Sequence, residues 1–113
     1  MRVNVDILAG ICGFRTSGTA HSSDDQNVEF SLPSDCQKIA NLLLELGNAT
    51  PFDAYAEIST KPESGARFLD ICRKVLSGCC SGCVVPAGLF KAMQVAAGLA
   101  LPKDICISLT KEV

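Results

Sequence analysis

Apolar and polar residues alternate in four stretches of the chain, a period-two pattern typical of strands with one buried and one solvent-facing side. The stretches are residues 2–9, 27–32, 52–59 and 104–111. Because each has a polar face, we expect helices on only one face of the sheet; a sheet covered on both faces would show continuous apolar runs. The polar face, open to solvent or buried in a dimer, would carry Asp6, Glu29, Asp53, Tyr55, Glu57 and Cys106.

Three other segments show the spacing of helices with one apolar side. They span residues 34–47, 63 or 64 to 77, and 86–98. Ser34 with Gln37 forms a capping-box pattern at the start of the first, and Pro86 is favoured in the first turn of the third. Gly47 and Gly78 are placed to end the first and the second.

The resulting order, β-β-α-β-α-α-β, predicts an α/β (α+β) fold: a two-layer sandwich with a mixed four-stranded sheet and three helices on one face. The 113 residues suit a single domain, residues 1–113, since a chain of this length buries roughly two-thirds of its unfolded surface. Residues 16–27, rich in Ser, Thr and Asp and including His21, are predicted to form a solvated, mobile loop.

Charge and hydropathy narrow the choice of partners. The net charge is -2 and the Lys and Arg residues are scattered, which argues against nucleic acid. The N-terminal stretch is too short and polar for a signal peptide, and no apolar run is long enough to cross a membrane. We therefore expect a cytoplasmic protein that does not bind membranes. Its binding partner would be an unknown protein or a second copy of the chain.

Seven cysteines in a reducing compartment are better interpreted as metal ligands, reactive thiols or core residues than as disulfides. Cys80 and Cys83 form a C-x-x-C pair, and Cys79 and Cys83 a C-x-x-x-C pair, spacings that let two thiolates turn toward one centre. Cys72, in the middle of a predicted helix, and Cys106, in the last predicted strand, are interpreted as structural.

Three segments carrying cysteines should converge. Cys12 lies in a glycine loop after the first strand, Cys36 in the first turn of the first helix, and Cys83 before the third helix, whose start lacks a good N-cap. Strand ends and helix starts line a common crevice in α/β domains. We expect four sulfur ligands for an iron–sulfur cluster or zinc: Cys12, Cys36, Cys80 and Cys83, with Cys79 as an alternative to Cys80.

Two other functions fit the same residues. In the first, the helix N-terminus lowers the pKa of Cys83, which acts as the nucleophile in thiol or sulfur-transfer chemistry with Cys12 or Cys80 as the resolving partner. In the second, the cysteines fill space in a structural or interaction protein. His21 as a ligand or base, and Asp6 with Asp53 as a carboxylate pair, are less favoured interpretations.

Three segments are similar to one known family. The Gly10-Ile11-Cys12-Gly13-Phe14 loop, residues 83–89 and residues 95–104 resemble a small uncharacterised cysteine-containing family of anaerobic bacteria and methanogenic archaea. The resemblance covers most of the chain and implies an anaerobic cytoplasm, but no activity. Cys79 and Cys80 are not part of the pattern that carries it.

Overall fold

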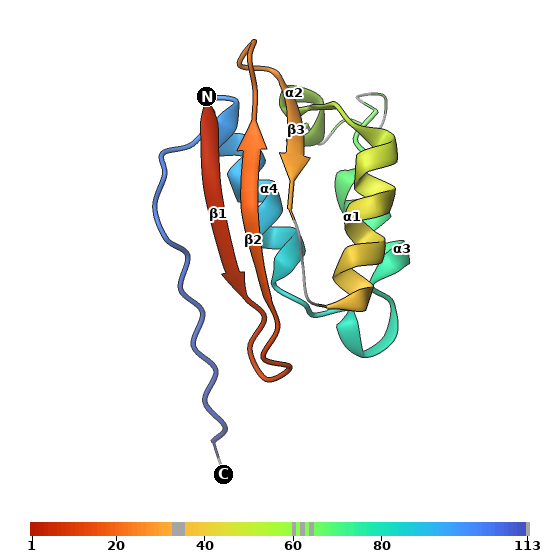
Figure 1. Cartoon of the computed structure of the whole chain (residues 1–113), viewed down its shortest axis with the longest axis vertical. Coiled ribbons are helices and arrows are strands. Elements are labelled where there is room, and N and C mark those ends of the chain that lie inside the picture. Colours follow the sequence, from red (N-terminus) through yellow and green to blue (C-terminus); the bar gives the residue numbers. More distant parts are fainter. Residues whose placement is uncertain (33–35, 60, 62, 64, 113) are drawn as a thin grey trace.

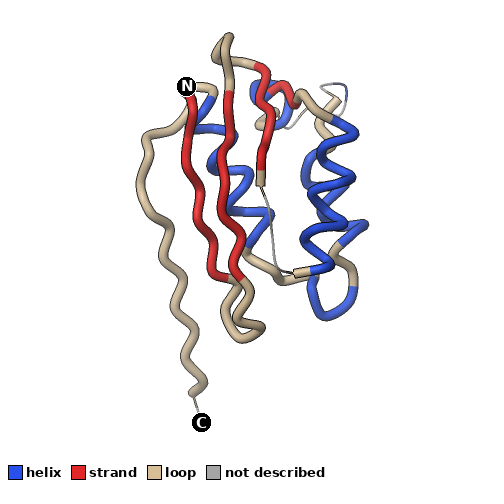
Figure 2. The backbone as a smooth tube through the Cα atoms, viewed as in Figure 1, coloured by secondary structure: helices blue, strands red, loops and turns tan. Residues whose placement is uncertain are grey.

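The computed structural model of the protein describes residues 1–32, 36–59, 61, 63 and 65–112. Figures 1 and 2 show a sheet with the long helix α4 behind its first two strands, and α1 and α3 beside it. The predicted α/β fold with a four-stranded sheet is confirmed. The elements in chain order are β1 (Arg2–Leu8), β2 (Arg15–His21), β3 (Asn27–Ser31), α1 (Gln37–Ala49), β4 (Phe52–Asp53), α2 (Ala54–Glu57), α3 (Phe68–Val75), the 3-10 helix η2 (Gly78–Cys80) and α4 (Val85–Ala96).

The sheet has the order β1-β2-β3-β4, and each neighbouring pair is antiparallel. The prediction of a mixed sheet is wrong because β2 lies between the two strands expected to be neighbours, and because β3 and β4 pair antiparallel across the connection through α1. The outer face is polar, with Asp6 and Arg15 forming an exposed ion pair on it. The expected set of residues is wrong in part, because Tyr55 and Glu57 lie on α2 and Cys106 lies on the C-terminal segment.

Strand β2 occupies part of the segment predicted as a mobile loop, so that prediction is wrong. Its inward side chains are the small Thr16 and Ala20, both buried. Gly18 allows β3 to approach closely, since a Cβ there would lie 2.1 Å from the carbonyl oxygen of Ser31. The strand is therefore buried through small residues that carry little hydropathy signal.

A short turn after β2 is held by one carboxylate. Asp24 accepts hydrogen bonds from the backbone N–H groups of Gln26, at 3.0 Å, and Asn27, at 2.8 Å. Together with the Asn27 side-chain amide, these donors hold the pKa of Asp24 well below its usual range.

The third predicted strand is also wrong beyond its first two residues. Only Phe52 and Asp53 pair with β3, and the chain then turns into α2. The Asp53 carboxylate caps this helix by accepting the N–H groups of Tyr55, at 3.0 Å, and Ala56, at 3.2 Å. Local capping thus prevails over an alternation that a helical turn accommodates equally well.

Three of the four α-helices in the described structure follow the prediction with shifted ends; the predicted number of three is wrong because α2 is additional. α1 continues through Gly47 to Ala49, and the proposed cap Ser34 lies outside the described residues. α3 begins at Phe68, later than expected, and Gly78 follows it with a φ of 77°. α4 matches closely, with Pro86 in its first turn.

The prediction of a last strand at residues 104–111 is wrong, because no strand follows α4 in the described part of the sequence. The segment is extended and exposed, and in Figure 1 it runs past the outer side of β1 without joining the sheet. Across the described ranges, no helix has the length and apolar content needed to cross a membrane.

Close packing fixes α4 against the sheet. A Cβ at Gly88 would lie 2.7 Å from Cδ1 of Ile7, so glycine lets the helix backbone approach β1. Edge-on aromatic contacts join the remaining layers: the Phe68 ring lies 5.2 Å from that of Phe52 and 5.7 Å from that of Phe90. These contacts hold the first turns of α4 next to the C-terminal end of β1, where Ile7 lies.

Candidate functional site

Three connections gather at one end of the molecule, the lower end in Figures 1 and 2: the β1–β2 hairpin, the start of α1 and the segment between α3 and α4. Each carries at least one of the cysteines predicted as ligands, so the expectation that these segments approach one another agrees with the fold.

Cys12 lies at the tip of the hairpin. Gly10 and Gly13 have φ values of 87° and 72°, in the left-handed region that glycine adopts without strain. The N–H of Gly13 donates to the Gly10 carbonyl at 2.9 Å, and that of Ala9 to the Phe14 carbonyl at 3.0 Å, which closes the turn. The Cys12 thiol is exposed and makes only a weak contact, 3.9 Å, to the Ala9 carbonyl.

Cys36 is the N-cap residue of α1. Its backbone is extended, and its carbonyl accepts the N–H of Ala40 at 2.8 Å. The side chain does not cap the helix and instead packs, half-buried, against the hydrophobic core. The predicted inward orientation of Cys36 is confirmed.

Cys80 and Cys83 lie on the tight connection between α3 and α4. The N–H of Ser81 donates to the Gly78 carbonyl and that of Cys83 to the Cys80 carbonyl, both at 3.1 Å. Both cysteine side chains are half-buried against the core. The side chain of Cys79, the alternative to Cys80, lies outside the described part of the structure.

Burial and neighbouring groups determine the pKa of Cys83. Burial is the main cause that raises the pKa of Cys83 above its usual value, and the nearby thiolates of Cys12, Cys80 and Cys36 raise it further. The N–H of Val85, donated from the first turn of α4, acts in the opposite direction. The prediction of a lowered Cys83 pKa is therefore wrong, because burial outweighs the helix N-terminus.

The segments that carry the cysteines gather at one end of the fold, but their sulfurs do not form a closed ligand set in the described structure. Among the described residues, no three Cys, His, Asp or Glu side chains form a group able to hold a metal ion as they stand. None of the six cysteines with described side chains forms a disulfide. The arrangement is that of several separate thiols on three chain segments at one end of the fold.

One of the remaining candidates, Cys72, lines a groove between α3 and α4 together with Cys83, and the others lie elsewhere. Cys72 is buried in the core, as predicted, and desolvation raises its pKa to about 12. Cys106 is exposed on the C-terminal segment, and His21 lies on β2. Asp6 and Asp53 lie on the first and last strands of the sheet, so they form no carboxylate pair.

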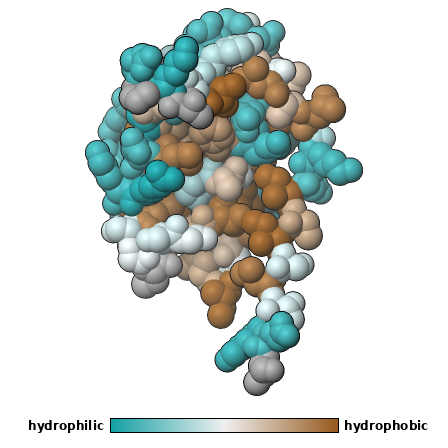
Figure 3. Space-filling model, turned by 180° about the vertical axis from the view of Figure 1, so that it is seen from behind, coloured by the Kyte–Doolittle hydropathy of each residue, from teal (hydrophilic) through white to brown (hydrophobic). Residues whose placement is uncertain are grey.

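An open groove of about 790 Å³, not expected from the sequence, lies between α3 and α4. Cys72, Cys83 and Phe90 line it together with the cations Arg73 and Lys91. Figure 3 shows apolar surface over this side of the molecule. The groove exposes part of the Cys83 surroundings to solvent.

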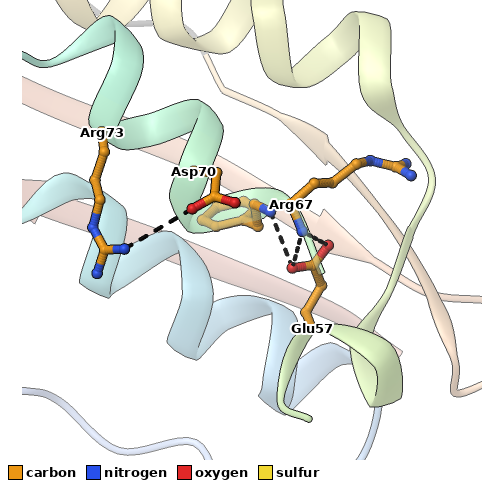
Figure 4. Close-up of polar contacts among 5 residues, drawn as sticks. Glu57, Arg67, Asp70 and Arg73 are labelled. Carbon is orange, nitrogen blue, oxygen red and sulfur yellow. Dashed lines mark hydrogen bonds and ion pairs between the residues drawn. The ribbon is translucent and has the colours of Figure 1, made fainter. Parts of the chain in front are cut away.

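A second polar cluster, also missed in the sequence, joins α2 to α3 (Figure 4). The Glu57 carboxylate accepts the backbone N–H groups of Arg67 and Phe68, at distances of 3.0 to 3.1 Å, and so caps α3 from a neighbouring element. The Arg67 guanidinium lies 5.1 Å from the centre of the Phe52 ring and donates to the Pro51 carbonyl at 3.2 Å. No sequence spacing marks this contact.

The fold and these positions define a small α/β protein with an antiparallel sheet and a cysteine cluster at one end. The chain belongs to DUF6951, a family of unknown function, which it matches over residues 3–109. The match confirms that the chain resembles an uncharacterised family. Searches of curated proteins and of solved structures found no significant match.

Proposed function

We propose that this protein binds zinc or an iron–sulfur cluster through the thiolates of Cys12, Cys36, Cys80 and Cys83. One observation carries the proposal: the three segments that carry these four cysteines lie together at one end of the fold, and Cys36, Cys80 and Cys83 pack against the same core. These residues come from the hairpin, the start of α1 and the α3–α4 connection, and chance packing of core cysteines gives no reason for such a meeting.

The chemistry of the cluster favours a soft cation. Like charges make four adjacent thiolates unfavourable by themselves, whereas a bound cation reverses this balance and keeps coordinating thiols deprotonated. Sulfur ligands select zinc and iron–sulfur clusters over hard cations such as Mg²⁺. The Val85 N–H, already donated to the Cys83 sulfur, would tune a bound centre from outside its ligand shell.

Closure of the site would require the hairpin tip with Cys12 to move toward the other three cysteines. Cys12 is exposed on a glycine-flanked turn, and its weak contact to Ala9 is easily lost. The other three sulfurs are held against the core. In a cytoplasm without oxygen, as the family resemblance implies, the thiols stay reduced, and a small electron carrier or metal-binding adaptor is the role we favour.

A structural role for the cysteines is the second candidate, because Cys36, Cys80 and Cys83 all pack against the core. Thiol or sulfur-transfer chemistry at Cys83 is the third. The raised pKa of Cys83 counts against a fast nucleophile at neutral pH.

The test is metal and sulfide analysis with absorption spectra on the full chain purified without oxygen, alone and after reconstitution with iron and sulfide or with zinc. We expect about one zinc ion or one cluster per chain. Cys12→Ser, Cys36→Ser, Cys80→Ser and Cys83→Ser should each lose it, whereas Cys106→Ser, the matched control on the exposed C-terminal segment, should retain it.

Two results would contradict the proposal: wild-type protein that stays metal-free after reconstitution, or a Cys83→Ser variant with wild-type metal content. Cys79→Ser, compared with Cys80→Ser, decides which of the two neighbours is the fourth ligand. If all the variants fold with unchanged stability and no metal is bound, the structural interpretation replaces the metal site.

A further inference from the structure

The two walls of the groove between α3 and α4 are regular helix faces. The α3 wall follows the i, i+3, i+4, i+7 spacing of one face, with Leu69, Cys72, Arg73 and Leu76. On α4, Phe90 and Lys91 line the groove, on the side of the helix opposite its buried face. The groove is therefore a hollow between two helix faces, each with one cation beside apolar residues.

The charge of the groove is opposite to that of the whole chain. The chain carries a net charge of -2, whereas the described residues that line the groove include Arg73 and Lys91 and no carboxylate. The Arg73 side chain is 77% exposed, and its contact to Asp70 spans 4.0 Å. No ion pair within the described ranges involves Lys91. Both cations are thus available to a ligand that carries negative charges.

The shape of the groove favours a helix over a small molecule. Pockets for small ligands enclose most of the ligand surface, whereas this groove is open, and Leu69 and Ile105 in its lining are 39% and 54% exposed. The C-terminal segment, which supplies Ile105, leaves the groove open and continues beside β1 in Figures 1 and 2. The eight residues of α3 span about 12 Å, which gives room for about two turns of another helix.

We propose that this groove docks an amphipathic helix of a partner protein, with apolar side chains between α3 and α4 and Asp or Glu side chains paired with Arg73 and Lys91. Helices bind in apolar grooves through residues at i, i+3 or i+4, and i+7. A contact of two turns is smaller than a standard interface, so the complex is transient.

The position of Cys83 gives this docking a use. Cys83 also lines the groove, so the docked helix lies beside one of the four cysteines proposed as ligands. The docking itself needs no metal. That it serves the transfer of an electron or a metal ion to the partner rests on the proposed function.

The test uses two labelled helical peptides of about 15 residues, with the same leucine stripe flanked by Glu in one and by Lys in the other, and fluorescence anisotropy on the full chain. We expect the Glu peptide to bind, and the Lys peptide to bind at least about tenfold more weakly. Arg73→Glu and Lys91→Glu should each raise the dissociation constant of the Glu peptide at least about threefold. Lys74→Glu, the matched control, reverses the charge of an exposed neighbour outside the groove lining and should change it less than about twofold.

Four results would overturn the proposal. No binding of the Glu peptide at millimolar concentration means that the groove docks no such helix, and equal binding of both peptides means that the cations play no part. Equal losses in Lys74→Glu and Arg73→Glu mean attraction by net charge alone. Self-association of the chain that Arg73→Glu weakens in sedimentation equilibrium assigns the groove to a second copy.

Metal content, measured on the same samples, separates this proposal from the metal site. Peptide binding by a protein that takes up no metal keeps the docking and removes the transfer role. A metal-loaded protein that does not bind the Glu peptide overturns the docking and leaves the metal site intact.

Discussion

The two ends of the molecule meet the same requirement, unpaired N–H groups at helix starts, with different chemistry. At the α2–α3 end, the carboxylates of Asp53 and Glu57 accept these groups. At the cysteine end, neither Cys36 nor Val84 caps its helix with its side chain in the described structure, and the sulfur of Cys83 meets the Val85 N–H instead.

The difference lies in when each acceptor is charged. Hydrogen bonds lower the pKa of Asp53, so this cap is ionised and complete at neutral pH. Burial raises the pKa of Cys83, so its thiol is neutral until a cation compensates the charge. The carboxylate end is stabilised by its own hydrogen bonds, whereas under our proposal the cysteine end is stabilised by a bound cation.

Removing the aromatic contact beneath the carboxylate end should have the largest effect. Phe68 is fully buried and contacts the rings of Phe52 and Phe90. Phe68→Ala should lower the free energy of unfolding by about 3–5 kcal/mol in urea titrations. Its neighbour Leu69, 39% exposed, is the matched control, and Leu69→Ala should cost clearly less; equal losses would mean that this end is not the stabilising one.

The second largest expected effect is a loss of folding stability at high pH, caused by the buried thiol of Cys72. The pKa of Cys72 is about 12 in the folded protein, against 9.0 for a free thiol, so its stabilising effect is complete below pH 9 and is lost as the pH rises from 9 toward 12. The loss from one such group approaches about 1.4 kcal/mol per pH unit.

Unfolding titrations of metal-free protein between pH 8 and 11 measure this loss. Cys72→Ala should flatten the pH dependence, although the raised pKa of Cys83 leaves a smaller slope in the same direction. An unchanged slope in the variant would assign the alkaline loss to other groups.

Removing one carboxylate cap should have the smallest of these effects. Glu57→Ala leaves the first N–H groups of α3 without their acceptor and should cost about 1–2 kcal/mol in thermal or urea unfolding. Asp70→Ala, which removes an exposed 4.0 Å contact to Arg73, is the control and should stay within about 0.5 kcal/mol. If Asp70→Ala lowered the free energy of unfolding as much as Glu57→Ala, the Glu57 cap would contribute no more than an exposed ion pair.

The sequence predicted the elements whose burial depends on large apolar side chains. β1, β3 and α4 lie near their expected positions for this reason. β2 was missed because its buried residues are Thr16 and Ala20, which look polar or neutral in a hydropathy pattern. Residues 104–111 show the converse, since alternation marks a chain able to form a strand but carries no information on whether an edge is within reach.

In the candidate site, too, local features could be predicted from the sequence and features that depend on distant residues could not. The glycines around Cys12 and the helix start at Cys36 could be predicted from local sequence, and these segments lie at the same end of the fold as the segment with Cys83. The direction of the Cys83 pKa was not readable, because it depends on burial by residues distant in sequence. The Glu57 cap could not be predicted for the same reason, because its acceptor lies on α2 and its donors lie at the start of α3.

The close contact between Gly88 and Ile7 has a consequence for kinetics. The β1–β2–β3 meander joins neighbours in sequence and forms from short loops, whereas α4 docks on β1 from the far part of the chain, a slower event. We expect the segment with Cys83 to reach the other cysteines only when α4 docks on β1. An ion held there would act mainly on the lifetime of the folded state, slowing unfolding more than it accelerates folding.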